Sequence, residues 1–311
     1  MNGVHTPLVS IILPVWNPRP DWLAEAIESA FHESRCRIEV ILVDDGSKEP
    51  PETWLSPRDA GRVKVVRIPH RGAGRARNVA LQHCNGEFIR FLDGDDLFLP
   101  ESTSLLVDLA RGRANIVTYG STIVCNESLR PRGRVRSSLR GFIHPQIAQG
   151  RFTCTIPAML IPRHVATEIG FDERLIVQGD WDFVLRVSEA VDFIGTRQPI
   201  YLYRRNENSL SSGAGARREA VRSTVLIIKG YIGRHPELHG TRAERRTRAY
   251  AQFLIAKLRN PQFPMRNRMF WKAAAADPLR GAVIAASRTA ALGLKTIKKL
   301  IAKPRLKARY G

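Results

Sequence analysis

Three aspartates stand together directly after an apolar run, in the segment LDGDD that ends at Asp96. Asp93, Asp95 and Asp96 present carboxylates at a spacing that suits a hard divalent cation. Mg²⁺ and Mn²⁺ take oxygen ligands and commonly bridge one or two carboxylates to phosphate groups. The same residue types also favour a solvated turn. The spacing by itself therefore leaves both a metal half-site and a plain turn open.

Further charged residues stand where a general base, a capping group or a phosphate ligand could act. Asp44 and Asp45 end an apolar run before Gly46, and we interpret Asp44 as a cap for the turn that follows. Asp180 opens a helical pattern, where it could cap the helix and also accept a proton as a general base. Arg77 lies at the start of another helical pattern, and a helix N-terminus with a nearby arginine suits a diphosphate.

The spacing of apolar residues predicts the elements that must position these side chains. Continuous apolar runs are typical of strands buried on both faces, and here they alternate with segments of helical spacing. Such alternation indicates βαβ units and a doubly wound sheet, in which ligands bind beyond the carboxyl ends of the strands. The expected strands are 9–15, 38–47, 63–68 and 87–92, and the expected helices are 22–31 and 76–83.

The second half of the domain continues this pattern less regularly. We expect a helix and then a strand in residues 101–124, a helix that begins near Gly179, and strand-like residues at 192–203. Residues 130–141 are rich in arginine, and we interpret them as an exposed basic loop.

The formal charge of +20 is unevenly distributed along the chain. Residues 1–212 carry 26 Lys and Arg against 25 Asp and Glu, a net charge of +1, whereas residues 213–311 carry 23 against 4, a net charge of +19. We therefore expect an α/β domain over 1–212 and a helical, strongly basic extension over 213–311.

A polycationic segment of this kind suits an anionic partner. Residues 295–311 set apolar side chains between cations, which is typical of an amphipathic helix on anionic lipid. A solvated, charged helix is the alternative. A nucleic-acid partner is disfavoured, because the sequence has no recognisable recognition module and few aromatic residues between the cations.

Cysteine usage and hydropathy favour a cytoplasmic protein. The four cysteines are far apart and form no CxxC pair, so we expect reduced, buried thiols. The first apolar run ends at Pro14, too early for a signal peptide, and no run approaches the ~20 apolar residues of a spanning helix. His70, His83 and His144 lack metal-ligand spacing and are expected at the surface.

Five segments, taken in order, resemble the family 2 glycosyltransferases over residues 7–210. They are VSIILPVWN, EVILVDDGS, GAGRARNVAL with NGEFIRFLDGDD, GFDERLIVQGDWDFVLRV, and YLYRRNENSLS. The resemblance implies a GT-A-like, Rossmann-related α/β fold with a mostly parallel sheet flanked by helices. It also implies an enzyme that transfers a sugar from a nucleotide-diphosphate donor with inversion at the anomeric carbon.

The resemblance also assigns roles to individual residues. Asp180 would be the catalytic base, which takes the proton from an acceptor hydroxyl, and Trp181 and Asp182 would lie on the acceptor side. Mn²⁺ or Mg²⁺, held by Asp95 and Asp96, would stabilise the departing diphosphate. The donor-binding residues would be Pro14, Val15, Trp16, Asp45, Arg71, Arg77 and Asp93.

By the same resemblance we expect a UDP-sugar as the donor and a glycan or lipid-linked acceptor in cell-envelope or polysaccharide synthesis. The basic C-terminal region would hold the enzyme at the anionic inner face of the cell membrane.

Two positions depart from the family pattern. Gly179 replaces the Glu that usually precedes the base, and Asn206 stands where the family often has His. These departures leave open a non-catalytic polyanion- or membrane-binding protein on a degenerate transferase scaffold. A nucleotidyltransferase is disfavoured because no glycine- and lysine-rich loop follows the first strand, and a dehydrogenase because GxGxxG is absent.

Overall fold

The computed structural model describes residues 6–259, except 111, 137, 153 and 206–213, together with residues 271 and 273–275. The chain divides into two compact units, Met1–Ile227 and Ile228–Gly311. The first unit carries the sheet, and the described part of the second is helical. The amphipathic helix expected at 295–311 and the family departure at Asn206 lie outside the described residues.

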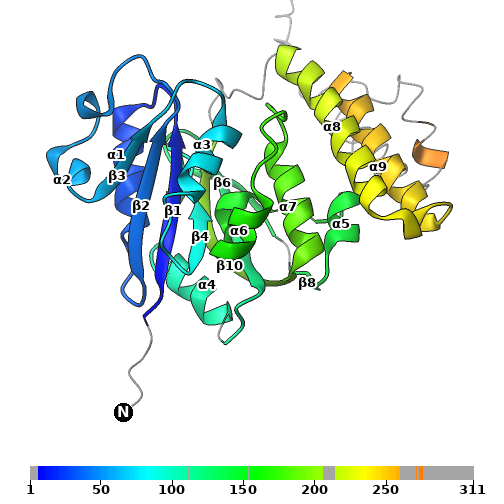
Figure 1. Ribbon diagram of the computed structural model, residues 1–311, viewed down its shortest axis with the longest axis horizontal. Helices are drawn as coiled ribbons and strands as arrows, with labels where there is room; N and C mark the ends of the chain where they lie inside the picture. Colours follow the sequence, from blue (N-terminus) through cyan, green and yellow to red (C-terminus); the bar gives the residue numbers. More distant parts are fainter. Residues whose placement is uncertain are drawn as a thin grey trace, which may run out of the picture. The chain divides into compact units, whose positions relative to one another are not determined.

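The N-terminal half of the sheet follows the expected βαβ pattern (Figure 1). Its elements are β1 (Leu8–Val15), α1 (Pro20–Ala30), β2 (Arg37–Asp44), β3 (Val63–Arg67), α3 (Ala73–Leu81) and β4 (Phe88–Phe91). The strands lie in the order β3-β2-β1-β4, and every neighbouring pair among them is parallel. The carboxyl ends of β1, β2 and β4 therefore meet at one edge of the sheet.

The core explains why β1 is apolar at almost every position. Its consecutive residues Ile11, Ile12 and Leu13 have no exposed surface, as expected for a strand covered on both faces. Leu23 and Ile27 of α1 belong to the same core cluster as Ile11 and Leu13, and α3 also contacts β1 and β2. Each fully buried aliphatic side chain contributes about 1.5–3 kcal/mol, which fixes the strand ends that carry the polar residues.

Beyond β4 the sheet becomes mixed. Its further central strands are β5 (Leu97–Phe98), β6 (Ile116–Cys125), β9 (Met159–Pro162) and β10 (Asp192–Arg204). The order continues as β4-β9-β6-β10-β5, in which β6 and β10 are parallel and the other pairs are antiparallel. Leu97 of β5 lies opposite Leu202 of β10. This pairing brings the DGDD segment next to the end of β10.

The segment interpreted as a basic loop, residues 130–141, instead contains strands β7 (Pro131–Val135) and β8 (Arg140–Gly141). β7 pairs with β6 and β8 pairs with β10, both antiparallel. The segment is mostly exposed, as expected, but its assignment as a loop was wrong. Pro and Gly are poor strand formers, and no apolar alternation marks the segment. The long strand β6 offers a pairing partner, and pairing of this kind overrides propensity.

The remaining helices complete both units. They are α2 (Pro57–Ala60), α4 (Ser102–Ala110), α5 (His144–Ala148), α6 (Arg163–Ile169), α7 (Gly179–Ala190), α8 (Ala214–Arg234) and α9 (Arg242–Arg259), with 3-10 turns at Pro51–Thr53, Ile156–Ala158 and Pro236–Leu238. In the second unit, Phe253 of α9 is buried with Ala249, Ala256 and Ala273. Among the helices of the described residues, none combines the length and the hydropathy that a membrane span requires.

The cysteines match the expectation of buried thiols. Cys36, Cys84 and Cys125 are buried, Cys154 is partly buried, and all four are free. Burial raises the pKa of Cys36 to about 11 and that of Cys84 to about 12.

Candidate active site

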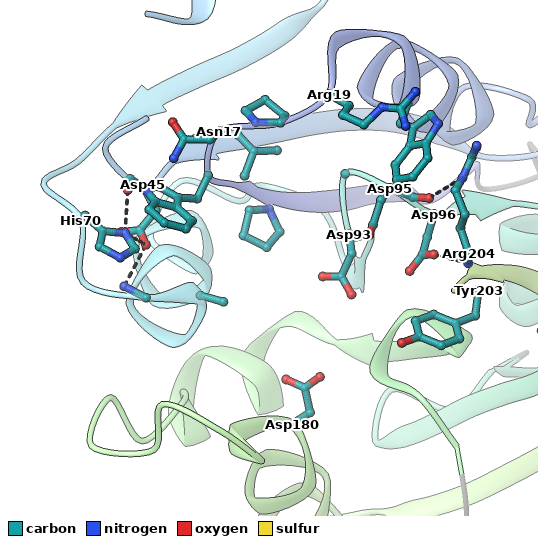
Figure 2. A pocket seen from close by; sticks show the side chains of 18 residues that line it. Asn17, Arg19, Asp45, His70, Asp93, Asp95, Asp96, Asp180, Tyr203 and Arg204 are labelled. Carbon is teal, nitrogen blue, oxygen red and sulfur yellow. Dashed lines mark hydrogen bonds and ion pairs between the residues drawn. The ribbon is translucent and has the colours of Figure 1, made fainter. Parts of the chain in front are cut away.

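A pocket of about 640 Å³ lies beyond the carboxyl ends of β1, β2 and β4 (Figure 2). This is the edge at which open α/β sheets bind ligands. The pocket is lined by many of the residues that the sequence singled out, namely Pro14, Val15, Trp16, Asp45, Asp93, Asp95, Asp96 and Asp180. Residues from three separate strand ends and from the start of α7 therefore meet in one cavity.

Four of the predicted residues do not line this pocket: Arg71, Arg77, Trp181 and Asp182. Asp182 is buried, and its Oδ2 accepts a hydrogen bond from Nε of Arg186, one helical turn later. The same oxygen forms an ion pair with Nη2 of Arg186. Its carboxylate therefore pairs within α7, and the acceptor-side role expected for it stays a prediction. The side chain of Arg71 is exposed, and the residue contributes its backbone N–H instead.

Asp45 organises one end of the pocket, which we call the nucleoside end and define by Trp16, Asp45 and His70. The Asp45 side chain is nearly fully buried. Its Oδ1 accepts a hydrogen bond from the backbone N–H of Arg71 at 2.8 Å, and its Oδ2 accepts one from the N–H of Gly72 at 2.8 Å. The carboxylate thereby shapes the loop that enters α3.

The turn after β2 requires its glycine. Gly46 has φ of +71°, and a Cβ there would lie 2.7 Å from the backbone N of His70. The neighbouring Asp44 accepts a hydrogen bond from the N–H of Ser47 at 2.9 Å, which confirms its interpretation as a turn cap.

His70 is exposed, as expected for a surface group, and it also lines the pocket. Its Nδ1 lies 2.9 Å from Oδ2 of Asp45. Its ring stacks on the Trp16 ring, with centroids 4.5 Å apart and an interplanar angle of 19°. Trp16 keeps 43% of its surface exposed, so the pair offers an aromatic face to a ligand. The sequence holds one weak signal for His70, its position just before the glycine-bearing loop.

Asp93 and Asp95 follow β4 at the opposite end, which we call the acid end and define by Asp93, Asp95 and Asp180. Burial and the nearby charge of Asp93 raise the pKa of Asp95 to about 6. A carboxyl group in this state would be stabilised in its ionised form by a cation.

Asp96 contradicts its predicted role as a metal ligand. It has no exposed surface. One oxygen accepts a hydrogen bond from the Tyr201 hydroxyl, and the other accepts one from the backbone N–H of Arg204 at 2.6 Å. Burial and its acidic neighbours raise the pKa of Asp96 far above its ordinary range. Asp96 therefore fastens the DGDD turn to β10.

Arg204 supports the same turn and was missed by sequence reasoning. Its Nε donates to the backbone carbonyl of Asp95 at 2.8 Å, and its Nη1 donates to the carbonyl of Glu127 at 2.9 Å. Its guanidinium also pairs with Glu25 and lies over the Trp22 ring. The residue holds the backbone of Asp95 in place from a distant strand.

Asp180 lies in the first turn of α7, and its side chain points toward Asp93 (Figure 2). The N-cap of α7 is Gln178, so the interpretation of Asp180 as the cap was wrong. Its Oδ1 accepts a hydrogen bond from Nη1 of Arg77 at 2.8 Å. Desolvation raises the pKa of Asp180, although half of its side chain is solvent-accessible, and the charge of Arg77 opposes the rise.

The acid end has the chemistry of a partial metal site. Within the described parts of the chain, no group of three or more His, Cys, Asp or Glu side chains could hold a metal ion. Asp93 and Asp95 supply two neighbouring carboxylates whose mutual repulsion a cation would relieve. Mg²⁺ in particular is often bound by one or two carboxylates with substrate phosphates. These residues therefore fit a divalent cation that is completed by a phosphate-bearing ligand.

Comparison with known sequences agrees with the resemblance to the family 2 glycosyltransferases. The model of the family described as glycosyl transferase family 2 matches residues 10–169, which is 160 of the 311 residues. The uncharacterized glycosyltransferase RT0329 of Rickettsia typhi is 31% identical over 202 residues, which cover 61% of this chain and 62% of that protein. Across three curated relatives from Rickettsia, the matched segment spans 27% to 62% of their own length.

Solved structures confirm the expected GT-A-like α/β fold class. TarS 1-349 of S. aureus, solved with UDP-GlcNAc, has a TM-score of 0.57 at 20% identity, covering 82% of this chain and 72% of that one. The mannosyltransferase PcManGT of Pyrobaculum calidifontis, solved with GDP-Man and Mn²⁺, has a TM-score of 0.56 at 18% identity, covering 93% and 81%.

Proposed function

The chain belongs to glycosyl transferase family 2, and from this membership we propose that it moves a sugar from a nucleotide-diphosphate donor to an acceptor hydroxyl. One observation carries the proposal: Asp45, Asp95 and Asp180, which come from three separate elements, line a single pocket. The fold is shared with TarS, solved with UDP-GlcNAc, and with a mannosyltransferase solved with GDP-Man.

The donor would lie along the pocket from the nucleoside end to the acid end. The nucleobase of the donor would stack on the exposed face of Trp16 beside His70, since aromatic faces attract planar rings. Asp93 would contact the ribose, and the diphosphate would reach Asp95. We favour a UDP-sugar as the donor.

Asp180 would act as the general base for an inverting transfer. Its carboxylate would take the proton from the acceptor hydroxyl while that oxygen attacks the anomeric carbon and the bond to the diphosphate breaks. A positioned base contributes about 10²–10⁴-fold to the rate. Half of the Asp180 side chain is exposed, which leaves room for an incoming alcohol.

Asp95, with Asp93 beside it, would hold Mn²⁺ or Mg²⁺. When bound, the cation would supply electrostatic stabilisation of the charge on the departing diphosphate. Arg204 and Asp96 would contribute by fixing the backbone that presents Asp95.

A panel of nucleotide sugars tests this function. We expect one donor, in the presence of Mn²⁺, to raise the melting temperature through preferential binding to the folded state, and to support transfer to a glycan or lipid-linked acceptor. A chelator should remove both effects. If no nucleotide sugar binds and none is consumed, the proposal fails and the non-catalytic polyanion-binding alternative, motivated by Gly179, takes its place.

We further propose that the acceptor is a glycan or lipid-linked molecule of the cell envelope. The basic residues 213–311 would bind the anionic inner face of the membrane, where the enzyme would encounter this acceptor. The support is their net charge of +19, from 23 basic and 4 acidic residues, since each basic residue near such a surface contributes about 1 kcal/mol. Flotation with phosphatidylglycerol vesicles should carry the full chain, and replacing Lys295, Lys298 and Lys299 with Gln should weaken it. Flotation of neither protein would refute the membrane assignment, and equal flotation of both would refute the contribution of these three lysines.

A further inference from the structure

We propose that Arg77 is a positioning residue that holds the base Asp180 and the donor-side Asp93 at a fixed separation, rather than a direct ligand of the donor. This inference rests on the proposed function, because it assigns a role within that same site.

The geometry of Arg77 supports a bridge. Only 6% of the residue is exposed, and it does not line the pocket. Its Nη1 donates to Oδ1 of Asp180 at 2.8 Å, and its Nη2 donates to Oδ1 of Asp93 at 2.9 Å. The two carboxylates stand 103 and 16 residues away from it in the sequence. One guanidinium thus joins the end of β4 to the start of α7.

An aromatic layer lies beside this guanidinium. The guanidinium lies 5.4 Å from the ring centre of Phe171. That ring stacks on Phe183 at 4.2 Å and meets Phe91 edge-on at 5.4 Å. The Arg77 guanidinium therefore lies between an aromatic layer and its two carboxylate partners.

The chemistry of the site requires arginine in particular. A guanidinium presents donors in a rigid, planar fork, whereas a lysine ammonium is a point charge on a flexible stem. Two carboxylates on one buried cation compensate for its desolvation. Nε of Arg77 has no hydrogen-bond partner, so its polar contacts are directed to the pocket carboxylates through the two terminal nitrogens.

The next residue on α3 strengthens the same connection. Nδ2 of Asn78 donates to the carbonyl of Phe171 at 3.0 Å, and Oδ1 of Asn78 accepts from the N–H of Phe171 at 2.7 Å. α3 therefore holds both the backbone that leads to Asp180 and the Asp180 carboxylate itself. The entry loop of α3 is in turn held by Asp45. The helix α3 thereby connects the nucleoside end of the pocket with Asp180, the proposed catalytic base.

Kinetics of Arg77→Gln and Arg77→Lys test this role, with Arg75→Gln as the matched control. Arg75 lies on the same helix, is 44% exposed and pairs with Glu173. We expect Arg77→Gln to lower kcat about 100-fold, the loss typical of a misplaced catalytic group. Donor affinity by calorimetry should fall much less, and only because Asp93 also loses its partner. Arg77→Lys should recover part of the loss, and Arg75→Gln should match the wild type. A fall in donor affinity that accounts for the loss would overturn the inference in favour of direct contact.

A double mutant separates positioning from general damage to the fold. In the Asp180→Asn background, Arg77→Gln should cause no further loss of kcat, because both substitutions remove the same function. Additive losses would show that Arg77 acts elsewhere.

A carboxyl titration decides the question even without activity. The charged groups that face Asp180 are Arg77 on α3 and Asp93 beyond β4. In protein labelled with ¹³C-aspartate, the Asp180 signal, identified by its loss in Asp180→Asn, should titrate at higher pH in Arg77→Gln than in wild type. An unchanged titration would overturn the bridge. A wild type that binds no donor would refute the proposed function, while this titration would still decide the role of Arg77.

Discussion

The two ends of the pocket use carboxylates in opposite ways. At the nucleoside end, Asp45 accepts hydrogen bonds from two backbone N–H groups at 2.8 Å and meets the His70 ring at 2.9 Å. At the acid end, burial and, as a smaller cause, the nearby charge of Asp93 raise the pKa of Asp95 to about 6. The fold holds the Asp45 carboxylate through two backbone N–H groups. By contrast, burial and the charge of Asp93 raise the pKa of Asp95 against the opposing charge of Arg204.

The difference arises from what surrounds each turn. Asp45 is followed by glycine and by a loop whose N–H groups donate hydrogen bonds to its carboxylate, so the negative charge of Asp45 stabilises the backbone of that loop. The DGDD turn sets its carboxylates side by side, and Asp96 is then drawn inward by Tyr201 and Arg204. Asp45 therefore organises the protein, whereas Asp93 and Asp95 have the chemistry of ligands. Substitutions at the two ends should have different signatures.

The largest effect is expected for Asp180→Asn at the acid end. The amide cannot accept the proton, so kcat should fall by about 10²–10⁴-fold. Donor affinity should stay near the wild-type value, because the change preserves shape and the hydrogen bond from Arg77 to Oδ1 remains possible. Steady-state kinetics and calorimetry together check this, and a matched loss of donor affinity would show that Asp180 binds the donor instead.

The pH dependence of the wild type follows from the same residue. Desolvation raises the pKa of Asp180 and Arg77 opposes the rise. A protonated carboxyl group cannot act as a base, so kcat should fall as the pH is lowered through this raised pKa. The acid limb of kcat should therefore lie above the ordinary value of about 3.9 for aspartic acid. A flat profile down to that value would contradict the assignment of the base.

The sequence predicted what depends on local pattern. The strands β1, β2 and β4 follow from mostly apolar runs, and Asp45 and Asp93 were singled out because they stand just after such runs. Asp180 was singled out at a helix start and by the family resemblance. The roles of Asp96 and Arg204 could not be predicted in this way. The sequence DGDD is the same whether the side chain of its last aspartate, Asp96, points to solvent or into the fold. The direction of that side chain is decided by β10, where Arg204 lies 108 residues away in the sequence.

The second effect in size is expected for Asp95→Asn. Mutation of a residue that supports a metal ligand typically lowers metal affinity or activity by about 10–100-fold. Removing the charge of Asp95 should lower the metal-dependent part of donor affinity by at least this factor. Calorimetry with Mn²⁺ and with a chelator measures that part directly. Asp96→Asn is the control, because its expected result is a lower melting temperature with the metal dependence retained. Equal donor affinity with and without metal in the wild type would contradict the role of Asp95.

A smaller effect, of a different kind, is expected for Asp45→Ala. The N–H groups of Arg71 and Gly72 would lose their buried acceptor, which costs about 1–3 kcal/mol in the free energy of unfolding. Donor affinity should fall by the same factor with metal and with chelator, because the loop rather than the cation site is disturbed. Urea denaturation and calorimetry check both statements. A loss confined to the metal-containing samples would remove the distinction between the two ends.

The smallest effect is expected for His70→Ala, which removes the ring that supports Trp16. An aromatic pair is worth about 0.5–1.5 kcal/mol beyond its buried area, so nucleotide affinity should weaken by a few-fold. The loss should be the same for the free nucleoside diphosphate and for the nucleotide sugar, since the ring lies at the nucleoside end, and kcat should not change. Trp16→Phe, which keeps a stacking face, should lose less than His70→Ala does. A change in kcat without a change in nucleotide affinity would mean that His70 acts on the reacting groups, and the two ends would then not be separable.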